Sequence, residues 1–356
     1  MFTPLALRPG LDAPNRVWLA PLTNQQSHAD GTCSDAEARF LGMRADGGFG
    51  LVETCAAFVA QDGKAWPGEL GVHDDAMVPG LTRLAKRVHD GGARISAQLF
   101  HGGLRASSEV SGQPTWSASA YAESGLATPR AATEVDLGRV IGQFADAARR
   151  CAAAGFDAVE LHGAHGYLLS QFQSTVYNQR TDAWGGPLEN RARLIREVAR
   201  AVRAAAPGLA LAVRLSPEDF GQAKGIDLDE TIQIARWLAE DGMTIAHLSL
   251  WRSTLNTTKR PDQHATPLFR AALGPNVTIA VAGAIWTPEE AQAQLALGAD
   301  AVALGRAGIG HHEWPRLAQA GLAIPRPPFA PAQLADEGLS APFIAYMRRW
   351  NGFVAE

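Results

Sequence analysis

Short apolar runs alternate with longer amphipathic segments along the chain, and this alternation repeats about eight times. Most of the runs are four to six residues long and are rich in Val, Ile, Leu and Ala. This composition is typical of strands that are buried on both faces of a parallel sheet. We therefore predict strands over residues 17–20, 51–55, 94–99, 158–162, 210–214, 245–250, 277–282 and 301–305.

The clearest helix is predicted over residues 136–154, after the third strand. Its larger apolar side chains recur on one helical face: Leu137, Val140, Ile141, Phe144 and Cys151. Asp136 is the expected N-cap, and Gly155 is the expected residue just beyond the C-terminus.

Two further helix starts carry sequence signals. Ser34 precedes an amphipathic segment, and Glu37 follows three residues later, which is the spacing of a capping box. Pro288 directly follows Thr287, a pair typical of an N-cap and the first helical position.

Eight successive strand–helix units predict an α/β fold whose parallel strands close into a single (β/α)₈ TIM barrel. The alternative is an open, doubly wound sheet. A dinucleotide-binding sheet of that kind carries Gly-x-Gly-x-x-Gly after its first strand, whereas this chain has APLTNQQSHADG there. We place the barrel at residues 1–320 and assign residues 321–356 to a C-terminal tail that packs on the barrel or on a neighbouring subunit.

Two connections are too long to be simple turns. Residues 100–135 follow the third strand, and residues 163–187 follow the fourth. Long loops at the C-terminal ends of barrel strands usually build or cover an active site, so we expect these two loops to do so.

The predicted strand tips carry more polar residues than a packed core would accept. In chain order, the tips contribute Thr23, Gln98, His162, His165, Tyr167, Arg214 and Arg306. Buried polar groups are costly without partners, so a bound polar molecule is the simplest explanation. The last two tips also contain Gly283 and Gly305, which suits the phosphate site that barrels commonly form after strands seven and eight, with Arg306 adding a charged contact.

His162 and His165 lie on one strand tip, and three interpretations are open for them. A zinc site is disfavoured because no third ligand is visible at a neighbouring tip. Satisfaction of the two rings by packing alone is also disfavoured. Binding of a substrate oxygen is the favoured interpretation, and we predict no metal.

The composition excludes several classes of protein. The chain has 356 residues, a formal net charge of −4 and 46% hydrophobic residues, so neither disorder nor a nucleic-acid or membrane partner is indicated. Its cysteines are Cys33, Cys55 and Cys151, which are too few and too far apart for a disulfide framework or an iron–sulfur site. No leader or membrane-spanning stretch is evident. We expect a cytoplasmic protein with a small-molecule substrate, and a homo-oligomer is compatible with the sequence.

One long stretch and five shorter ones resemble the Old Yellow Enzyme family of FMN-dependent NADH:flavin oxidoreductases and ene-reductases. The long stretch is AGFDAVELHGAHGYLLSQFQSTVYNQRTDAWGGPLENRARL at residues 154–194. The shorter ones are NRVWLAPLT, AQLFHGG, VRLSPEDF, VAGAIWTPEEA and ALGRAGIGHHEWP, and they occur in the family's order.

The resemblance implies a binding role for each of several residues. FMN would be held by Pro21, Leu22, Thr23, Ala57, Gln98, Arg214, Gly283, Gly305 and Arg306. Among these, Gln98 and Arg214 would contact the pyrimidine edge of the flavin, and Thr23 would contact its O4. The catalytic residues would be His162 and His165, which bind the activating oxygen of the substrate, and Tyr167, which donates a proton.

The implied reaction is a ping-pong reduction of activated C=C bonds in enones, nitroalkenes or maleimides. NADH or NADPH reduces the flavin, and hydride leaves from flavin N5. Two features depart from the family pattern: Phe58 lies next to Ala57, and LWRSTLNTTKR follows the sixth strand. Trp251 in that segment is a candidate substrate-binding residue.

Three alternatives remain open at this point. The same flavin barrel could dehydrogenate an amine or an alcohol. In a different class, the histidine pair could belong to a metal-dependent barrel lyase or hydrolase. The chain could also bind a flavin without catalysis.

Overall fold

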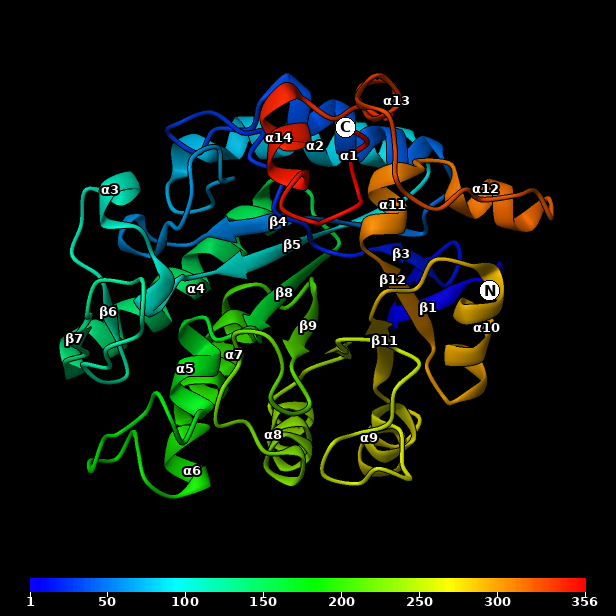
Figure 1. Ribbon diagram of the computed structural model, residues 1–356. Helices are drawn as coiled ribbons and strands as arrows, with labels where there is room; N and C mark the ends of the chain where they lie inside the picture. The colour runs from blue at the N-terminus through cyan, green and yellow to red at the C-terminus, as the bar shows by residue number, and fades with distance from the viewer.

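The computed structural model describes residues 1–356, and its centre is a closed barrel of eight parallel strands (Figure 1). Around the barrel the strands are β3 (Val17–Leu19), β4 (Leu51–Phe58), β5 (Arg94–Phe100), β8 (Ala158–Gly163), β9 (Ala210–Leu215), β10 (Ile245–Ser249), β11 (Thr278–Ala282) and β12 (Ala301–Leu304). The last strand pairs with the first, with Val302 opposite Val17. This pairing excludes the open sheet and confirms the predicted (β/α)₈ barrel.

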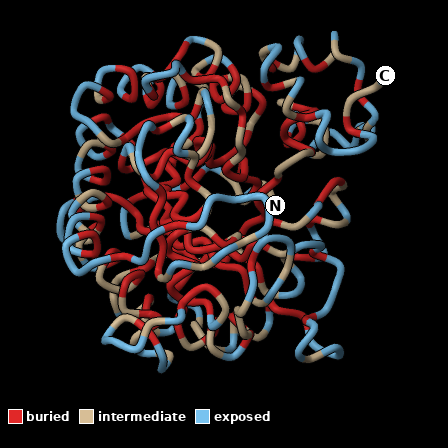
Figure 2. Tube along the Cα trace, turned by 60° about the vertical axis from the view of Figure 1, so that its left-hand side comes forward, coloured by how far each residue is buried: buried red, intermediate tan, exposed pale blue.

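Helices follow the strands and form the outer layer, as Figure 1 shows. They are α1 (Asp35–Asp46), α2 (Val78–Asp90), α4 (Glu134–Ala153), α7 (Arg193–Ala205), α8 (Leu228–Glu240), α9 (Ala265–Leu273), α10 (Pro288–Ala296), α11 (Arg306–Gly310) and α12 (Trp314–Gln319). Their apolar faces and the outward-facing strand residues form one core of 77 buried residues. Figure 2 shows this burial in the interior, with exposed residues on the loops and outer surfaces. None of the helices combines the length and the apolarity needed to cross a bilayer.

The N-terminal end of α4 differs from the sequence prediction, whereas its C-terminal end agrees with it. Thr133, not Asp136, is the N-cap, and Asp136 is the third helical residue, whose carboxylate accepts from the Thr133 backbone N–H. The two residues therefore form a capping box, in which the side chain of each accepts a hydrogen bond from the backbone N–H of the other. Gly155 has φ +86°, which agrees with its predicted place beyond the helix. The N-caps at Ser34 and Thr287 are also confirmed, although the Glu37 side chain accepts from Asn24 and does not complete a capping box with Ser34.

The N-terminal end of the barrel is filled with small side chains. An inner cluster contains Trp18, Leu51 and Ile245, with alanines from β8, β9, β11 and β12. A hairpin of β1 (Leu5–Arg8) and β2 (Leu11–Ala13) packs its apolar residues into the same cluster. Because this end is closed by apolar packing, the open end is the C-terminal one.

Strand β4 contains a bulge that changes which side chains point into the barrel. Glu53 pairs with Ser96 and Ala56 pairs with Gln98, so three steps along β4 match two along β5. Side chains normally alternate between the two faces of a strand, and an extra residue reverses that alternation. Beyond the bulge, Ala56 therefore faces inward, while Ala57 faces the outer core.

The long loops and the tail contain short elements of their own. After β5 come 3-10 turn η3 (Gly103–Arg105), α3 (Ser108–Ser111), β6 (Trp116–Ser117) and β7 (Arg130–Ala131); after β8 come α5 (Leu168–Gln173) and α6 (Leu188–Arg191). The 3-10 turns η1 (Gln61–Gly63) and η2 (Asp75–Met77) follow β4, and the tail forms α13 (Pro331–Asp336) and α14 (Ala341–Met347). The tail packs on the barrel layer of its own chain: the Phe343 ring meets the edge of Phe40 at 5.2 Å, and Arg44 donates to the Glu337 carbonyl at 2.6 Å.

Candidate active site

A cavity of about 370 Å³ opens at the C-terminal end of the barrel. It is lined by Pro21, Leu22, Thr23, Ala56, Trp66, Gln98, His162, His165, Tyr167 and Arg214. These residues come from the ends of β3, β4, β5, β8 and β9 and from the loop that carries Trp66, which are far apart in the sequence. Of the residues predicted to hold the flavin ring or the substrate, the structure brings together all but Ala57 and Trp251.

Ala56 takes the place that the sequence analysis gave to Ala57. The bulge in β4 turns Ala56 toward the cavity, and it packs with Phe58 and Phe100. Ala57 is fully buried among the helices outside the strand. A bulge leaves no clear mark in a short apolar run, which is why the sequence did not reveal this reversal.

The two imidazole rings meet at a right angle, with centroids 5.0 Å apart. His162 Nδ1 accepts from the Ala164 N–H at 3.4 Å, so its proton is carried by Nε2, which has no partner in the chain. His165 Nε2 contacts Ser249 Oγ at 2.7 Å. Burial lowers the pKa of both rings well below 6.5, and Arg214 lowers them further, so both are neutral at neutral pH.

The backbone at His165 is strained. Its φ of +61° lies in the left-handed region, which is uncommon for a residue with a side chain. The conformation is held by a hydrogen bond from its N–H to Ser216 Oγ at 3.2 Å. Gly166 continues the turn with φ +71°, and a Cβ there would lie 2.6 Å from the Gln222 carbonyl oxygen. Strain of this kind is characteristic of functional sites.

Tyr167 lies at the start of α5, beside the histidine pair. Its ring packs edge-on against Phe100 at 4.6 Å and against His162 at 4.9 Å. Burial raises the pKa of the phenol above its usual 10, so the hydroxyl keeps its proton at neutral pH. The hydroxyl makes no hydrogen bond within the chain and is free to act on a ligand.

Gln98 and Arg214 form the polar floor of the cavity. Gln98 Nε2 donates to Glu160 Oε1 at 2.7 Å, which leaves its Oε1 for a ligand. Arg214 Nη2 donates to Ser249 Oγ at 3.2 Å, while its buried Nε has no partner. An unpartnered buried donor in a lined cavity fits a ligand with acceptor atoms, such as the edge of a flavin.

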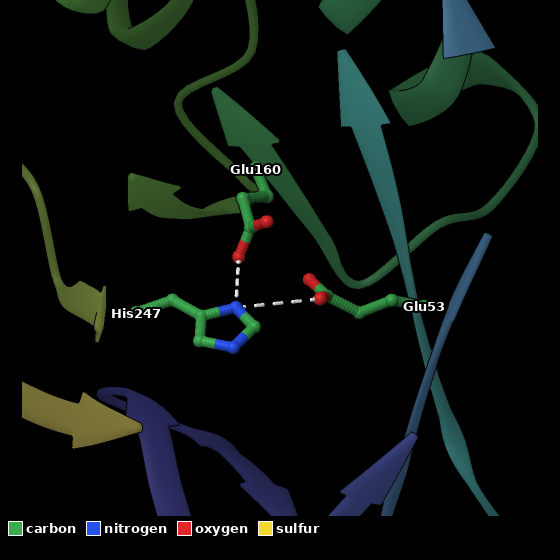
Figure 3. Close-up of side chains that lie close together, drawn as sticks. All are labelled: Glu53, Glu160 and His247. Carbon is green, nitrogen blue, oxygen red and sulfur yellow. Dashed lines mark hydrogen bonds and ion pairs between the residues drawn. The ribbon is translucent and has the colours of Figure 1, made fainter. Parts of the chain in front are cut away.

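Below this floor lie three buried ionisable side chains, Glu53, Glu160 and His247, shown in Figure 3. Glu160 lies two residues before His162 in β8, so it falls on the same face and one layer deeper. Glu53 and His247 were missed, although an ionisable residue inside an apolar run is itself a signal. The sequence alone does not show that the register of the barrel brings these three side chains, from β4, β8 and β10, into contact.

Gly283, Gly305 and Arg306 lie at the ends of β11 and β12, next to one another in the barrel. A Cβ at Gly283 would lie 2.9 Å from the Ser253 nitrogen, so only glycine allows the loop after β10 to approach. Arg306 is in no ion pair, and burial, with a contribution from the charge of Arg252, lowers its pKa. A half-buried guanidinium without an acidic partner fits a phosphate.

Trp251 lies outside the main cavity. Its side chain is 58% exposed and lines a neighbouring cavity of about 600 Å³. Phe220 stands between Trp251 and His165, with ring centroids 6.1 Å and 6.0 Å away. Phe220 is therefore the aromatic residue of that cavity that contacts His165.

Two tryptophans on the loops have different surroundings. Trp66 lines the main cavity, and its indole Nε1 is buried without a partner. Trp116 is fully buried and donates to Asp62 at 2.9 Å, so it packs beneath the loop.

Comparison with known proteins places the chain in a known family. The NADH:flavin oxidoreductase / NADH oxidase family matches residues 1–324. The chain is 35% identical over 322 residues to the probable NADH-dependent flavin oxidoreductase YqiG of Bacillus subtilis, covering 88% of this chain and 86% of that protein. It is also 35% identical over 250 residues to an NADPH dehydrogenase of Bacillus licheniformis, covering 70% of this chain and 72% of the other.

Solved structures show the same similarity over the whole fold. The Old Yellow Enzyme homologue from Zymomonas mobilis superposes with a TM-score of 0.82 at 30% identity, covering 95% of this chain and 96% of that one. Morphinone reductase in complex with tetrahydroNAD gives a TM-score of 0.82 at 30% identity, with 96% of each chain covered.

Proposed function

Because this chain belongs to the NADH:flavin oxidoreductase / NADH oxidase family, the family of Old Yellow Enzyme, it is an FMN-dependent oxidoreductase that uses NADH or NADPH, and we propose that it reduces activated C=C bonds. The observation that carries this proposal is the arrangement of two neutral imidazoles and a protonated phenol around one cavity. The substrates we propose are enones, nitroalkenes and maleimides, whose double bond is activated by a carbonyl or nitro oxygen.

The residues that would hold FMN divide into two groups. Pro21, Leu22, Thr23, Ala56, Gln98 and Arg214 would surround the ring, and Gly283, Gly305 and Arg306 would hold the phosphate. When bound, FMN supplies a two-electron carrier that takes hydride from NADH or NADPH and delivers it to the alkene. Arg214 would stabilise the negative charge of the reduced ring, since its guanidinium stays charged even when buried.

The histidine pair would bind the activating oxygen of the substrate. Because both rings are neutral, each offers a single N–H, and the orienting contact from Ala164 makes Nε2 the donor of His162. If Ser249 donates its hydroxyl proton to His165 Nε2, then His165 Nδ1 carries the second free N–H. Two donors aimed at an oxygen stabilise negative charge that develops there during reduction of the double bond.

Tyr167 would supply the proton that completes the reduction. Its phenol is protonated and has no competing hydrogen bond, so its proton is available to the α-carbon of the alkene. The position of the ring against His162 brings the donor and the oxygen-binding site into one cavity.

Anaerobic spectroscopy tests this proposal in two steps. The purified protein is mixed with NADH or NADPH, and the flavin absorbance near 450 nm is followed; cyclohexenone, a nitroalkene or a maleimide is then added. We expect bleaching in the first step and recovery in the second. A flavin that is reduced by an amine or an alcohol, and is not reoxidised by any of these alkenes, would instead indicate a dehydrogenase.

A further inference from the structure

Three ionisable side chains are enclosed in the barrel directly below the cavity floor. Glu53 comes from β4, Glu160 from β8 and His247 from β10, and each is less than 5% exposed. His247 Nδ1 lies 2.6 Å from Glu160 Oε2 and 3.6 Å from Glu53 Oε2 (Figure 3). None of the three lines the cavity, so none can touch a ligand there.

The surroundings decide where the protons of this cluster lie. Burial and the neighbouring Glu160 charge raise the pKa of Glu53 well above its usual range, so Glu53 is a neutral acid. Burial alone would also raise the pKa of Glu160, but His247, Arg214 and Gln98 more than offset it and lower that pKa. Burial lowers the pKa of His247, which is therefore a neutral ring.

The charge balance agrees with this assignment. The other titratable groups that face the cluster are Arg214 on β9 and the neutral rings of His162 and His165. One carboxylate and one guanidinium then remain charged, and they compensate each other. The unpartnered Nε2 of His247 is consistent with a neutral ring, because a protonated Nε2 would be an orphaned buried donor.

The cluster reaches the cavity floor through Glu160. Its Oε2 accepts from His247, and its Oε1 accepts from Gln98 Nε2 at 2.7 Å. The second contact fixes the orientation of the Gln98 amide, which leaves its Oε1 for a ligand in the cavity. The Glu160 charge also compensates Arg214, the other floor residue.

We propose that Glu53 and His247 are positioning residues, which keep Glu160 as the single anion beneath the cavity floor. Glu160 in turn orients the Gln98 amide. Its negative charge also acts on a flavin bound above Arg214. This inference rests on the proposed placement of FMN. Its measurable consequence is the midpoint potential of the bound flavin, since a negative charge below the ring opposes reduction.

A divalent metal ion is the competing occupant, because one ligand atom from each of the three residues lies within 4.8 Å of the others. Two contacts argue against a metal ion. The Gln98 amide N–H points at a Glu160 oxygen, and the Arg214 cation already compensates the charge of that carboxylate.

The same substitution at the two carboxylates gives the sharpest test, since only one of them is charged in our assignment. In the FMN-loaded protein, Glu160→Gln removes the anion, and we expect a more positive midpoint potential, corresponding to a roughly tenfold shift in the reduction equilibrium, or about 30 mV for two electrons. Glu53→Gln replaces a neutral acid with a neutral amide, and we expect a potential close to that of the unsubstituted protein.

The histidine is tested through the pH dependence of the potential. His247→Leu removes a donor to Glu160, so Glu160 should take up a proton within the measured range, and the potential should rise more steeply as the pH falls from 8 to 6. His247→Asn places an amide N–H near the position of Nδ1, and it should restore the original profile. If His247→Leu does not fold, the contrast between the two glutamine variants decides the question alone.

Arg214→Met separates a failure of this inference from a failure of the flavin placement. Loss of that cation should make the potential more negative. If it does so while Glu160→Gln has no effect, or if Glu53→Gln shifts the potential as much as Glu160→Gln, the charge assignment is refuted. If Arg214→Met also leaves the potential unchanged, FMN does not lie where we placed it and both proposals fail. Stoichiometric metal in the purified protein would likewise overturn the inference.

Discussion

At the scale of single residues, the cavity works by fixing protonation states through burial. His162 and His165 are kept neutral, and Tyr167 is kept protonated, by the same desolvation. Most of these residues could be named from the sequence because they fall at strand tips. The proton on Tyr167 was also predictable, but the neutral state of the two histidines was not, because it depends on how closely they and Arg214 are packed in space.

Tyr167→Phe should separate the two halves of the reaction. Because the hydroxyl has no partner in the chain, its loss leaves the packing unchanged but removes the proton donor. We expect reduction of the flavin by NADH or NADPH to be unaffected and its reoxidation by an enone to slow about 10²–10⁴-fold. Stopped-flow absorbance measures both rates, and equal reoxidation rates in the two proteins would remove Tyr167 from the mechanism.

At the scale of the elements, the eight strands were predictable to within a few residues because long buried apolar runs have few other interpretations. The exceptions have local causes. The N-cap of α4 is Thr133 because Asp136 serves better as its reciprocal partner. Ala56 replaces Ala57 because the bulge in β4 is a property of the pairing with β5, which one strand's sequence does not contain.

The capping box of α4 can be tested without disturbing the cavity. Thr133→Ala removes the acceptor for the Asp136 N–H, and this should lower the free energy of unfolding by about 1 kcal/mol. Chemical denaturation followed by circular dichroism measures the change. Thr133→Ser, which keeps the hydroxyl, is the matched control and should lose much less; equal losses would assign the effect to the methyl group.

The first turn of α1 gives the protein a pH-dependent stability. Burial raises the pKa of Glu37 from 4.5 to about 7, against the opposing hydrogen bonds from Asn24 and Ser27. The folded state therefore holds a proton that the unfolded state releases. This contribution to stability is complete below pH 4.5 and is lost as the pH rises through 7.

Glu37→Gln should remove that dependence. Between pH 5 and pH 8 the unsubstituted protein should lose about 2–3 kcal/mol of unfolding free energy that the variant keeps. Denaturant titrations at several pH values measure this difference. Glu109→Gln, on an exposed side chain, is the matched control, and a parallel profile for both variants would contradict the assignment.

At the scale of the whole molecule, the C-terminal tail reaches the end of the site that we assign to the phosphate. Trp350 follows α14 and lies over Arg306, with its ring centroid 5.0 Å from the guanidinium carbon, while Trp286 lies 5.8 Å away. The family match ends at residue 324, so the tail lies beyond it. The sequence indicated that the tail docks, but not that it touches this arginine.

Trp350→Ala should weaken FMN binding without changing the chemistry. Loss of a cation–π contact worth about 0.5–1 kcal/mol should raise the Kd for FMN about two- to fivefold. Titration of the apoprotein with FMN, followed by flavin fluorescence, measures this, and Trp350→Phe should retain part of the contact. An unchanged Kd in the alanine variant would show that the tail does not order Arg306.

The division of the barrel into strand interior and surrounding loops has a practical consequence. Glu53, Glu160 and His247 are anchored in strands, whereas Trp66 and Trp251 project from loops. Redesign of those loops can therefore alter which substrates are accepted, while the driving force for their reduction by the flavin stays the same. Conversely, replacing the single anion beneath the floor would retune that driving force in a catalyst whose selectivity is already satisfactory.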